Sequence, residues 1–187
     1  KLLQEDVMDF TTEEQKNLEE TFSRALDYCA KIKADLNLPE MHLIKTKGAY
    51  YGPSVYYTRE HCIVIPAPQL GNQATLFKTM IHEIFHIYSR FNTDKRDALY
   101  AEIGYQKLEQ LELSPFLKER MIYNPDGVDV RYAIEVQDST GRSFQAIPAI
   151  YSRYSSFRMM PLLQTFLFQL FEVEKEGDVW KVVNDGP

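Results

Sequence analysis

Cysteine is scarce in this chain, because only Cys29 and Cys62 occur among its 187 residues. Two isolated cysteines exclude a framework of several disulfides, and they form no Cys-x-x-Cys pair of the kind that holds a structural metal. We expect both side chains to fill apolar space in the interior. The sequence is therefore typical of a protein of a reducing compartment such as the cytosol, or of an exported protein without disulfides.

Basic residues and long apolar runs are also lacking. The chain has 21 Lys and Arg against 27 Asp and Glu, a formal net charge of -6. Binding of nucleic acid needs concentrated positive charge, so nucleic acid is not expected as a partner. The most apolar run, residues 159–171, contains proline and polar residues and is shorter than the roughly 20 residues of a membrane span. No membrane span is predicted. The oligomeric state stays open, and a start at Lys1 is compatible with a removed leader or pro-segment.

The remaining composition is that of a folded domain, with 44% apolar and 13% aromatic residues. A chain of this length buries roughly 70% of the surface that its unfolded form exposes. The sequence shows no internal repeat, no low-complexity tract and no linker. We therefore predict a single domain over residues 1–187, built around one hydrophobic core.

Hydrophobic spacing predicts helices and strands along the whole chain. Helices are predicted over 11–36, 73–90, 94–105, a short stretch from Ser114, and 161–173, and strands over 42–46, 55–58, 61–65, 132–136, 143–151 and 179–183. Thr11 and Glu14 have the spacing of a capping box for the first helix. A turn is predicted over 124–127. These elements together predict an α+β fold, with a small mixed sheet, a buried helix under it and supporting helices.

The predicted helix over 73–90 carries the pattern His82-Glu83-Ile84-Phe85-His86. Residues four apart share a helix face, so both imidazoles can reach one zinc ion at about 2.0–2.1 Å. Glu83 lies at the flank of that face, where a carboxylate can take a proton from a bound water. Polar residues recur on the same face at Thr75, Thr79 and Ser89, which indicates that it meets something polar. The alternative is two hydrogen-bonded core histidines with Glu83 at the surface.

These residues resemble the zincin metallopeptidases. The resemblance covers residues 55–105 and includes Thr79, three positions before the first histidine, and uncharged residues between the motif's fixed positions. It implies a Zn²⁺-dependent endopeptidase with a zincin-like fold, a protein or peptide substrate and Glu83 as general base. In such enzymes an edge strand before the helix pairs with an extended substrate, a role that falls here on 55–58 or 61–65.

The resemblance leaves the biological setting and even the activity open. The same features suit a bacterial effector protease delivered into a host cell, which cuts a host protein, and a cytosolic peptidase. An alternative from another class is a catalytically inactive zincin-like module that binds a protein.

A catalytic zinc normally has three protein ligands and one open position. In the gluzincin branch the third ligand is a glutamate on the next helix, and the resemblance points to Glu102. Glu109 and Glu112 are alternatives, and Asn92 is a weaker one because an amide oxygen binds zinc less well than a carboxylate. Ser89 and Asn92 stand where the metzincin branch has glycine and histidine, so the chain is gluzincin-like more than metzincin-like.

Two further assignments concern residues outside the motif. Tyr132, with Arg131 beside it, is predicted to stabilise the carbonyl oxygen during hydrolysis, and the alternative is a strand tyrosine packed on the sheet. His42 and His61 are expected on strands as ordinary polar residues, because neither has a second ligand at a suitable spacing in the sequence.

Overall fold

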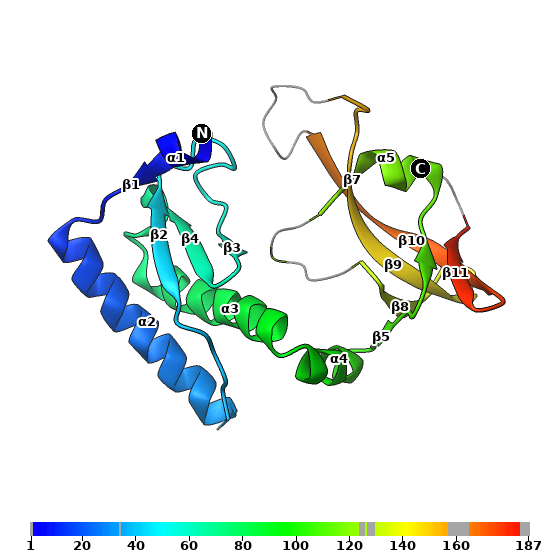
Figure 1. Ribbon diagram of the computed structural model, residues 1–187, viewed down its shortest axis with the longest axis horizontal. Helices are drawn as coiled ribbons and strands as arrows, with labels where there is room; N and C mark the ends of the chain where they lie inside the picture. Colours follow the sequence, from blue (N-terminus) through cyan, green and yellow to red (C-terminus); the bar gives the residue numbers. More distant parts are fainter. Residues whose placement is uncertain (1, 34, 124–125, 127–129, 157–164, 184–187) are drawn as a thin grey trace. The chain divides into compact units, whose positions relative to one another are not determined.

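The structure, a computed structural model, describes residues 2–33, 35–123, 126, 130–156 and 165–183 (Figure 1). The contacts within the chain divide it into two compact units, Lys1–Thr93 and Asp94–Pro187.

The first unit combines a four-stranded sheet with helices. In chain order it contains α1 (Leu2–Asp6), β1 (Val7–Met8), α2 (Thr12–Ile32), β2 (His42–Thr46), β3 (Tyr57–Arg59), β4 (Cys62–Pro66), the 3-10 helix η1 (Ala67–Gln69) and α3 (Gln73–Phe91). The strand order is β1-β2-β4-β3, with β2 and β4 parallel and β3 antiparallel to β4. Of the two segments predicted as the edge strand, 55–58 matches the edge strand β3. The alternative, 61–65, is wrong because β4 is internal.

The predicted capping box begins α2. The Thr11 hydroxyl accepts a hydrogen bond from the Glu14 amide at 3.2 Å, and the Glu14 carboxylate accepts one from the Thr11 amide at 2.8 Å. The same carboxylate oxygen lies 2.7 Å from Nζ of Lys45 on β2, which is only 5% exposed. This lysine, together with the cap, lowers the pKa of Glu14. One glutamate therefore caps α2 and also ties it to the sheet.

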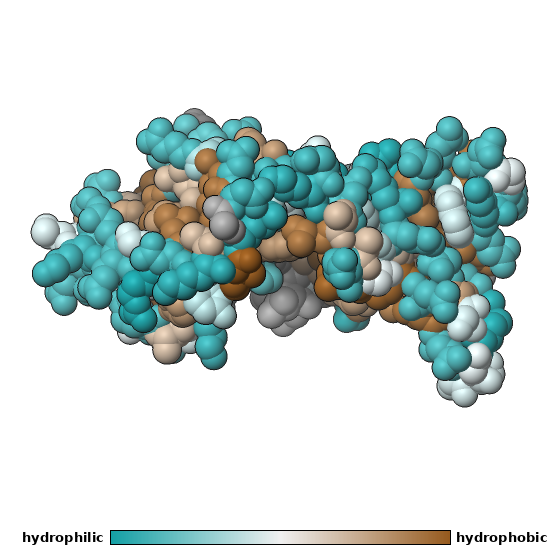
Figure 2. Space-filling model, turned by 90° about the horizontal axis from the view of Figure 1, so that it is seen from below, coloured by the Kyte–Doolittle hydropathy of each residue, from teal (hydrophilic) through white to brown (hydrophobic). Residues whose placement is uncertain are grey.

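Apolar side chains from α2, β4, α3 and the turn between the last two form the core of the first unit. Its buried members are Leu18, Ala25, Ile63, Ile65, Leu70, Leu76, Met80, Ile84 and Ile87. Figure 2 shows hydrophilic side chains over much of one face of the molecule, with apolar ones between them. Such a mixed surface is ordinary for a folded protein.

The second unit is built around a larger, curved sheet. In chain order it contains α4 (Thr93–Glu102), β5 (Tyr105–Lys107), β6 (Leu111–Glu112), α5 (Pro115–Arg120), β7 (Met121–Ile122), β8 (Tyr132–Gln137), β9 (Ser143–Ser152), β10 (Phe166–Glu176) and β11 (Val179–Val182). The strand order is β5-β8-β9-β10-β11-β6, and β7 also pairs with β9. This unit has its own buried cluster, formed by Leu108, Leu117, Ala133, Ile147, Ala149, Tyr151, Phe171 and Val173.

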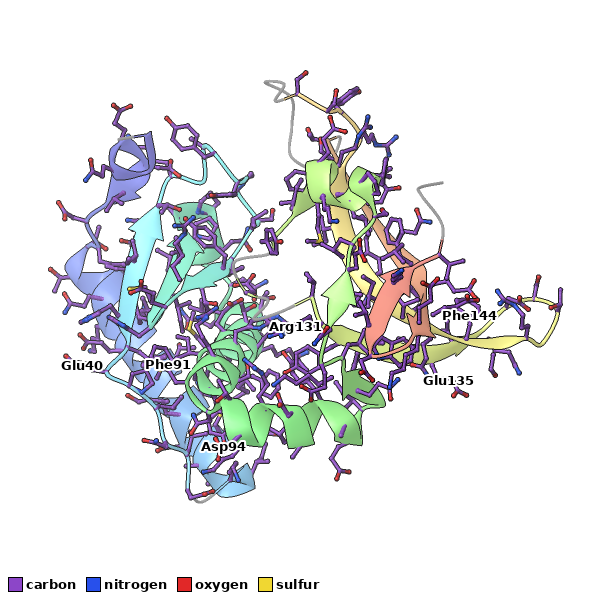
Figure 3. All side chains as sticks on the ribbon, turned by 45° about the vertical axis from the view of Figure 1, so that its right-hand side comes forward. Glu40, Phe91, Asp94, Arg131, Glu135 and Phe144 are labelled. Atoms are coloured by element: carbon purple, nitrogen blue, oxygen red, sulfur yellow. The ribbon has the colours of Figure 1, made fainter. Side chains whose placement is uncertain are left out.

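The helix predicted over 161–173 is wrong where the structure describes it. Residues 166–176 form β10, which pairs with β9 from Phe166 to Val173, and residues 161–164 lie outside the described part. Phe171 and Val173 are buried while Phe168 and Leu170 are exposed, an alternation that belongs to a strand. Gly177, with φ of 62°, turns the chain into β11. Figure 3 shows the long strands of this sheet with their side chains and labels Phe144 on β9 and Glu135 on β8.

The α+β class is confirmed, since both units combine helices with sheet. The prediction of one core is wrong for the described residues, because their buried apolar side chains form two clusters. The single domain over 1–187 stays a prediction. Both cysteines are free and half-buried, although full burial was expected. Among the described residues no helix has the length and hydropathy needed to cross a membrane. Of the predicted turn, only Asp126 is described.

The cap of α2 gives a first prediction. Replacing Thr11 by alanine removes the acceptor for the Glu14 amide, and we expect the free energy of unfolding to fall by about 1 kcal/mol. The matched control is Thr12→Ala, next in the chain and equally exposed, which we expect to change stability by less than about 0.5 kcal/mol. Urea unfolding followed by circular dichroism measures both, and equal effects would contradict the capping role.

Candidate metal centre

The apolar face of helix α3 fixes the orientation of the helix about its own axis. The Asn72 side chain caps its first turn by accepting a hydrogen bond from the Thr75 amide at 3.1 Å. Leu76, Met80 and Ile84 are then buried in the core of the first unit, each at most 1% exposed. Since the helix turns by about 100° per residue, this anchoring decides which of the motif's side chains leave the core.

The two histidines of the motif leave the core together. His82 is exposed and His86 is half-buried. Their Nε2 atoms lie 2.8 Å apart, and their ring centroids are 4.5 Å apart with planes inclined at 82°. At this distance one ring donates its Nε2–H to the lone pair of the other. The edge nitrogens that could bind a metal therefore already point at one another.

The distance between these nitrogens can be compared with that in a zinc site. Two nitrogens bound tetrahedrally at about 2.0–2.1 Å are separated by roughly 3.3 Å. The observed separation of 2.8 Å is shorter by about half an ångström, a difference that small changes of the χ angles provide. A cation would replace the shared proton, with both rings then carrying their proton on Nδ1. The donor pair thus fits zinc in atom type and nearly in separation.

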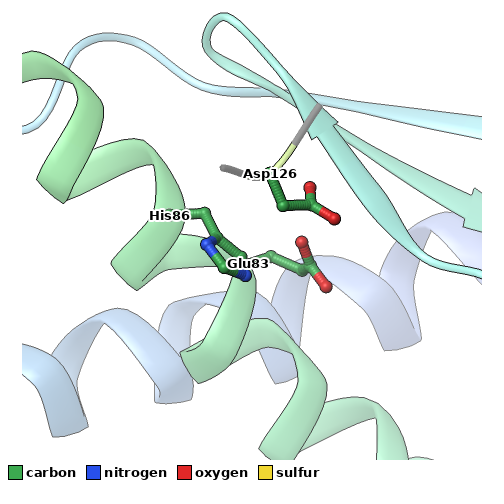
Figure 4. Close-up of side chains that lie close together, drawn as sticks. All are labelled: Glu83, His86 and Asp126. Carbon is green, nitrogen blue, oxygen red and sulfur yellow. The ribbon is translucent and has the colours of Figure 1, made fainter. Parts of the chain in front are cut away.

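Glu83 is the most buried polar residue of the motif, with 3% of its surface exposed. Figure 4 shows it on α3 one turn from His86; Asp126, which the figure also labels, belongs to the second unit. The sequence predicts Glu83 at the flank of the face that carries the histidines. Its burial shows that this flank is turned away from solvent. The alternative of hydrogen-bonded core histidines with a surface glutamate is wrong in its burial, because Glu83 is buried while His82 is exposed and His86 half-buried.

Tyr56 is a neighbour of Glu83 that the sequence did not single out. Burial raises the pKa of Tyr56, and the negative charge of Glu83 raises it further. Its hydroxyl is buried and has no hydrogen-bond partner among the residues that the structure describes. Because the charge of Glu83 acts on the Tyr56 hydroxyl, Tyr56 is a candidate functional residue. In the sequence, only its position in the predicted edge-strand segment 55–58 distinguishes Tyr56. This signal is weak in a chain with 12 tyrosines.

The edge strand is fastened to the same helix. Arg90, one turn after His86 on α3, donates to the carbonyl of Glu60 at 2.6 Å and to the hydroxyl of Thr58 at 2.8 Å. Helix α3 and strand β3 are in contact. One guanidinium therefore holds the strand, and the turn that follows it, against the helix that carries the motif.

The predicted third ligands lie on other elements. Glu102 is the last residue of α4 and is exposed, and Glu109 and Glu112 are also exposed, all three in the second unit. The choice of Glu102 as third ligand stays a prediction. Asn92 lies just after α3, where its side-chain nitrogen donates to the carbonyls of Tyr88 and Asn37, each at 2.9 Å. These bonds favour a role for Asn92 in ending the helix.

Tyr132 belongs to a polar cluster inside the second unit. Its hydroxyl accepts from Nε of Arg96 at 2.8 Å and donates to the carboxylate of Asp97 at 2.5 Å. Burial and the bond to Asp97 raise the pKa of Tyr132 to about 12. Asp97 also pairs with Lys107 at 2.8 Å, and its pKa is lowered to about 2, chiefly by that lysine. The geometry favours a structural role for this hydroxyl, and its predicted catalytic role stays a prediction.

Comparison of the chain with protein-family models, with curated proteins and with solved structures gave no match. The likeness to the zincins therefore rests on the five residues of the motif and their flanks. What the structure contributes is the paired imidazoles, the buried carboxylate and the edge strand at the same helix.

The Tyr132 cluster gives a second prediction. Tyr132→Phe removes the hydroxyl that both Arg96 and Asp97 use, and leaves two buried or half-buried charged groups short of a partner. We expect the free energy of unfolding to fall by about 1–3 kcal/mol. Tyr123→Phe is the matched control, since Tyr123 is 70% exposed and should tolerate the change. Denaturant melts of the two variants decide, and an unchanged midpoint for Tyr132→Phe would contradict the structural role.

Proposed function

We propose that this protein is a zinc-dependent endopeptidase, with His82 and His86 as metal ligands and Glu83 as general base. The observation that carries the proposal is the pair of imidazole Nε2 atoms, which lie 2.8 Å apart on α3 with the carboxylate of the motif buried at the adjacent position. Imidazole nitrogens are donors that zinc prefers, and a carboxylate beside the metal can serve as the general base.

The role of the metal follows from the ligands. Zinc held by such a set supplies a Lewis acid that polarises the carbonyl of a peptide bond and lowers the pKa of a water to about 7. The two histidines would hold the metal, each through the lone pair of one ring nitrogen.

Glu83 is the proton carrier in this proposal. Its carboxylate accepts a proton as water attacks the peptide carbonyl, and it returns that proton to the nitrogen of the leaving amine. Because the side chain is 3% exposed, bulk water has little access to it. The buried Tyr56 hydroxyl, which has no hydrogen-bond partner among the described residues, is a candidate donor to the attacking water.

The substrate class that we propose is an extended protein segment. Strand β3 is the edge strand of the four-stranded sheet, in the order β1-β2-β4-β3, and an edge strand is the usual place where an extended peptide adds to a sheet. Arg90 fastens β3 beside the helix that carries the histidines. A peptide added to this edge would run along the same face of the unit as the motif.

The third ligand that we propose is Glu102, as the resemblance to the gluzincin branch implies. Glu109 and Glu112 are alternatives of the same chemistry, and Asp126 is a further, half-buried carboxylate of the second unit.

A third prediction concerns turnover. Glu83→Gln keeps the size of the side chain but removes the base, so zinc should stay bound while cleavage of an unfolded protein such as casein falls by at least about 100-fold. Glu20→Gln on α2, an exposed glutamate, should cleave like the wild type.

Two results would speak against the proposal. Equal cleavage by Glu83→Gln and wild type would contradict the base role. Stoichiometric zinc in the wild type, with no cleavage of casein or of a library of extended peptides, would favour the inactive protein-binding module instead.

A fourth prediction concerns the third ligand. Glu102→Ala should weaken zinc binding by more than about 100-fold, which exceeds the usual effect of losing an outer-shell partner. Glu109→Ala, Glu112→Ala and Asp126→Asn serve as matched carboxylate controls, and we expect each to change the affinity by less than about threefold. Competition with a fluorescent zinc chelator measures all four. A large loss in any control, with Glu102→Ala unaffected, would move the ligand to that residue.

A further inference from the structure

The two histidines outside α3 lie beside each other in the first unit. The ring centroids of His42 and His61 are 5.1 Å apart, with planes inclined at 60°. The main chain fixes this neighbourhood, because the His42 amide donates to the His61 carbonyl at 3.1 Å. Parallel pairing of β2 with β4 continues from there, with Cys62 opposite His42. All four histidines of the chain therefore occur as two close pairs.

This second pair is open to solvent at one end of the sheet. His42 is exposed and His61 is half-buried. Strand β1 pairs with β2 only at Lys45 and Thr46, so it does not run alongside His42. Strand pairing holds the backbone of His42, and its amide in turn holds the carbonyl of His61, while both rings remain at least partly accessible. This combination favours binding without a large ordering cost.

The separation of the rings matches that of two imidazoles on one cation. Nitrogen–metal bonds of about 2.0–2.1 Å at angles of 90–110° place two ring centroids roughly 4.5–5.2 Å apart. The His42–His61 distance of 5.1 Å and the His82–His86 distance of 4.5 Å both fall in this range. We infer that His42 and His61 form a second metal site, which binds a transition-metal cation that favours imidazole, such as Zn²⁺, Ni²⁺ or Cu²⁺.

The ligand count sets the character of this site. Among the described residues, no third carboxylate, thiol or imidazole lies close enough to these two rings to complete a three-ligand group. The cation would keep several waters and bind more weakly than at a three-ligand centre. By the usual order of affinities, Cu²⁺ should bind more tightly than Ni²⁺ or Zn²⁺. A bound cation would also bridge the starts of β2 and β4 and stabilise the sheet that carries the edge strand β3.

The experiment is a metal titration of the full chain, with ZnCl₂ and CuCl₂ as probes and isothermal calorimetry as readout. The variants are His42→Asn, His61→Asn and the double variant His82→Ala/His86→Ala. We expect the double variant to keep one weak binding event. Adding His42→Asn or His61→Asn to it should weaken that event at least tenfold for both metals, because each change leaves a single imidazole. The copper signal in electron paramagnetic resonance should show two nitrogen ligands in the double variant and fewer after His42→Asn.

The outcomes separate this inference from the proposed function. A double variant that binds no metal, or that binds metal equally after His42→Asn and His61→Asn, would overturn the second site whatever happens at α3. A wild type whose only binding event is lost in His42→Asn would support the second site and count against the zinc peptidase. Because His42 is exposed, its substitution should not unfold the chain, and a circular dichroism melt of His42→Asn checks this.

Discussion

The proposed metal site depends on one constraint, the fixed orientation of α3 about its own axis. Leu76, Met80 and Ile84 hold one face of the helix in the core, and this fixes where every other side chain of the helix points. His82 and His86, four residues apart, then emerge together with their Nε2 atoms facing. Glu83, one position on, turns into the protein. A rotation of the helix by a single residue would separate these roles.

The same helix also organises what surrounds the motif. Arg90 uses two bonds of its guanidinium to hold the β3–β4 turn and the hydroxyl of Thr58. The fixed partners of the arginine are a backbone carbonyl and a buried side chain, so the strand cannot shift without losing them. Helix, carboxylate, imidazole pair and edge strand are thus one packed arrangement within the first unit. The second unit has its own sheet, core and polar cluster around Tyr132.

Local patterns were enough to predict much of the first unit. The spacing of apolar residues placed α3 within one residue of its end, and the capping box placed the start of α2. Both are signals that neighbouring residues carry. The strand β10 was missed because Phe166, Leu167 and Phe168 are apolar in succession, which hides the alternation that pairing with β9 imposes. The Gly177-Asp178 pair before β11 was the available hairpin signal.

The spacing of residues in the sequence could not predict contacts between residues that are far apart in the chain. His42 and His61 were read as ordinary strand residues because their neighbourhood arises only when β2 pairs with β4. Tyr56 acquires its interest from the charge of Glu83, which is far along the chain. The proposed third ligand is of the same kind, since a carboxylate on another element can join the two histidines only through tertiary structure.

The most direct measurement is an anomalous X-ray difference map, recorded at the zinc edge from crystals of the full chain grown with zinc. The account predicts a peak within about 2.0–2.1 Å of Nε2 of both His82 and His86, with a carboxylate oxygen as a further ligand. An empty position there, with the two rings still bonded to each other, would contradict it.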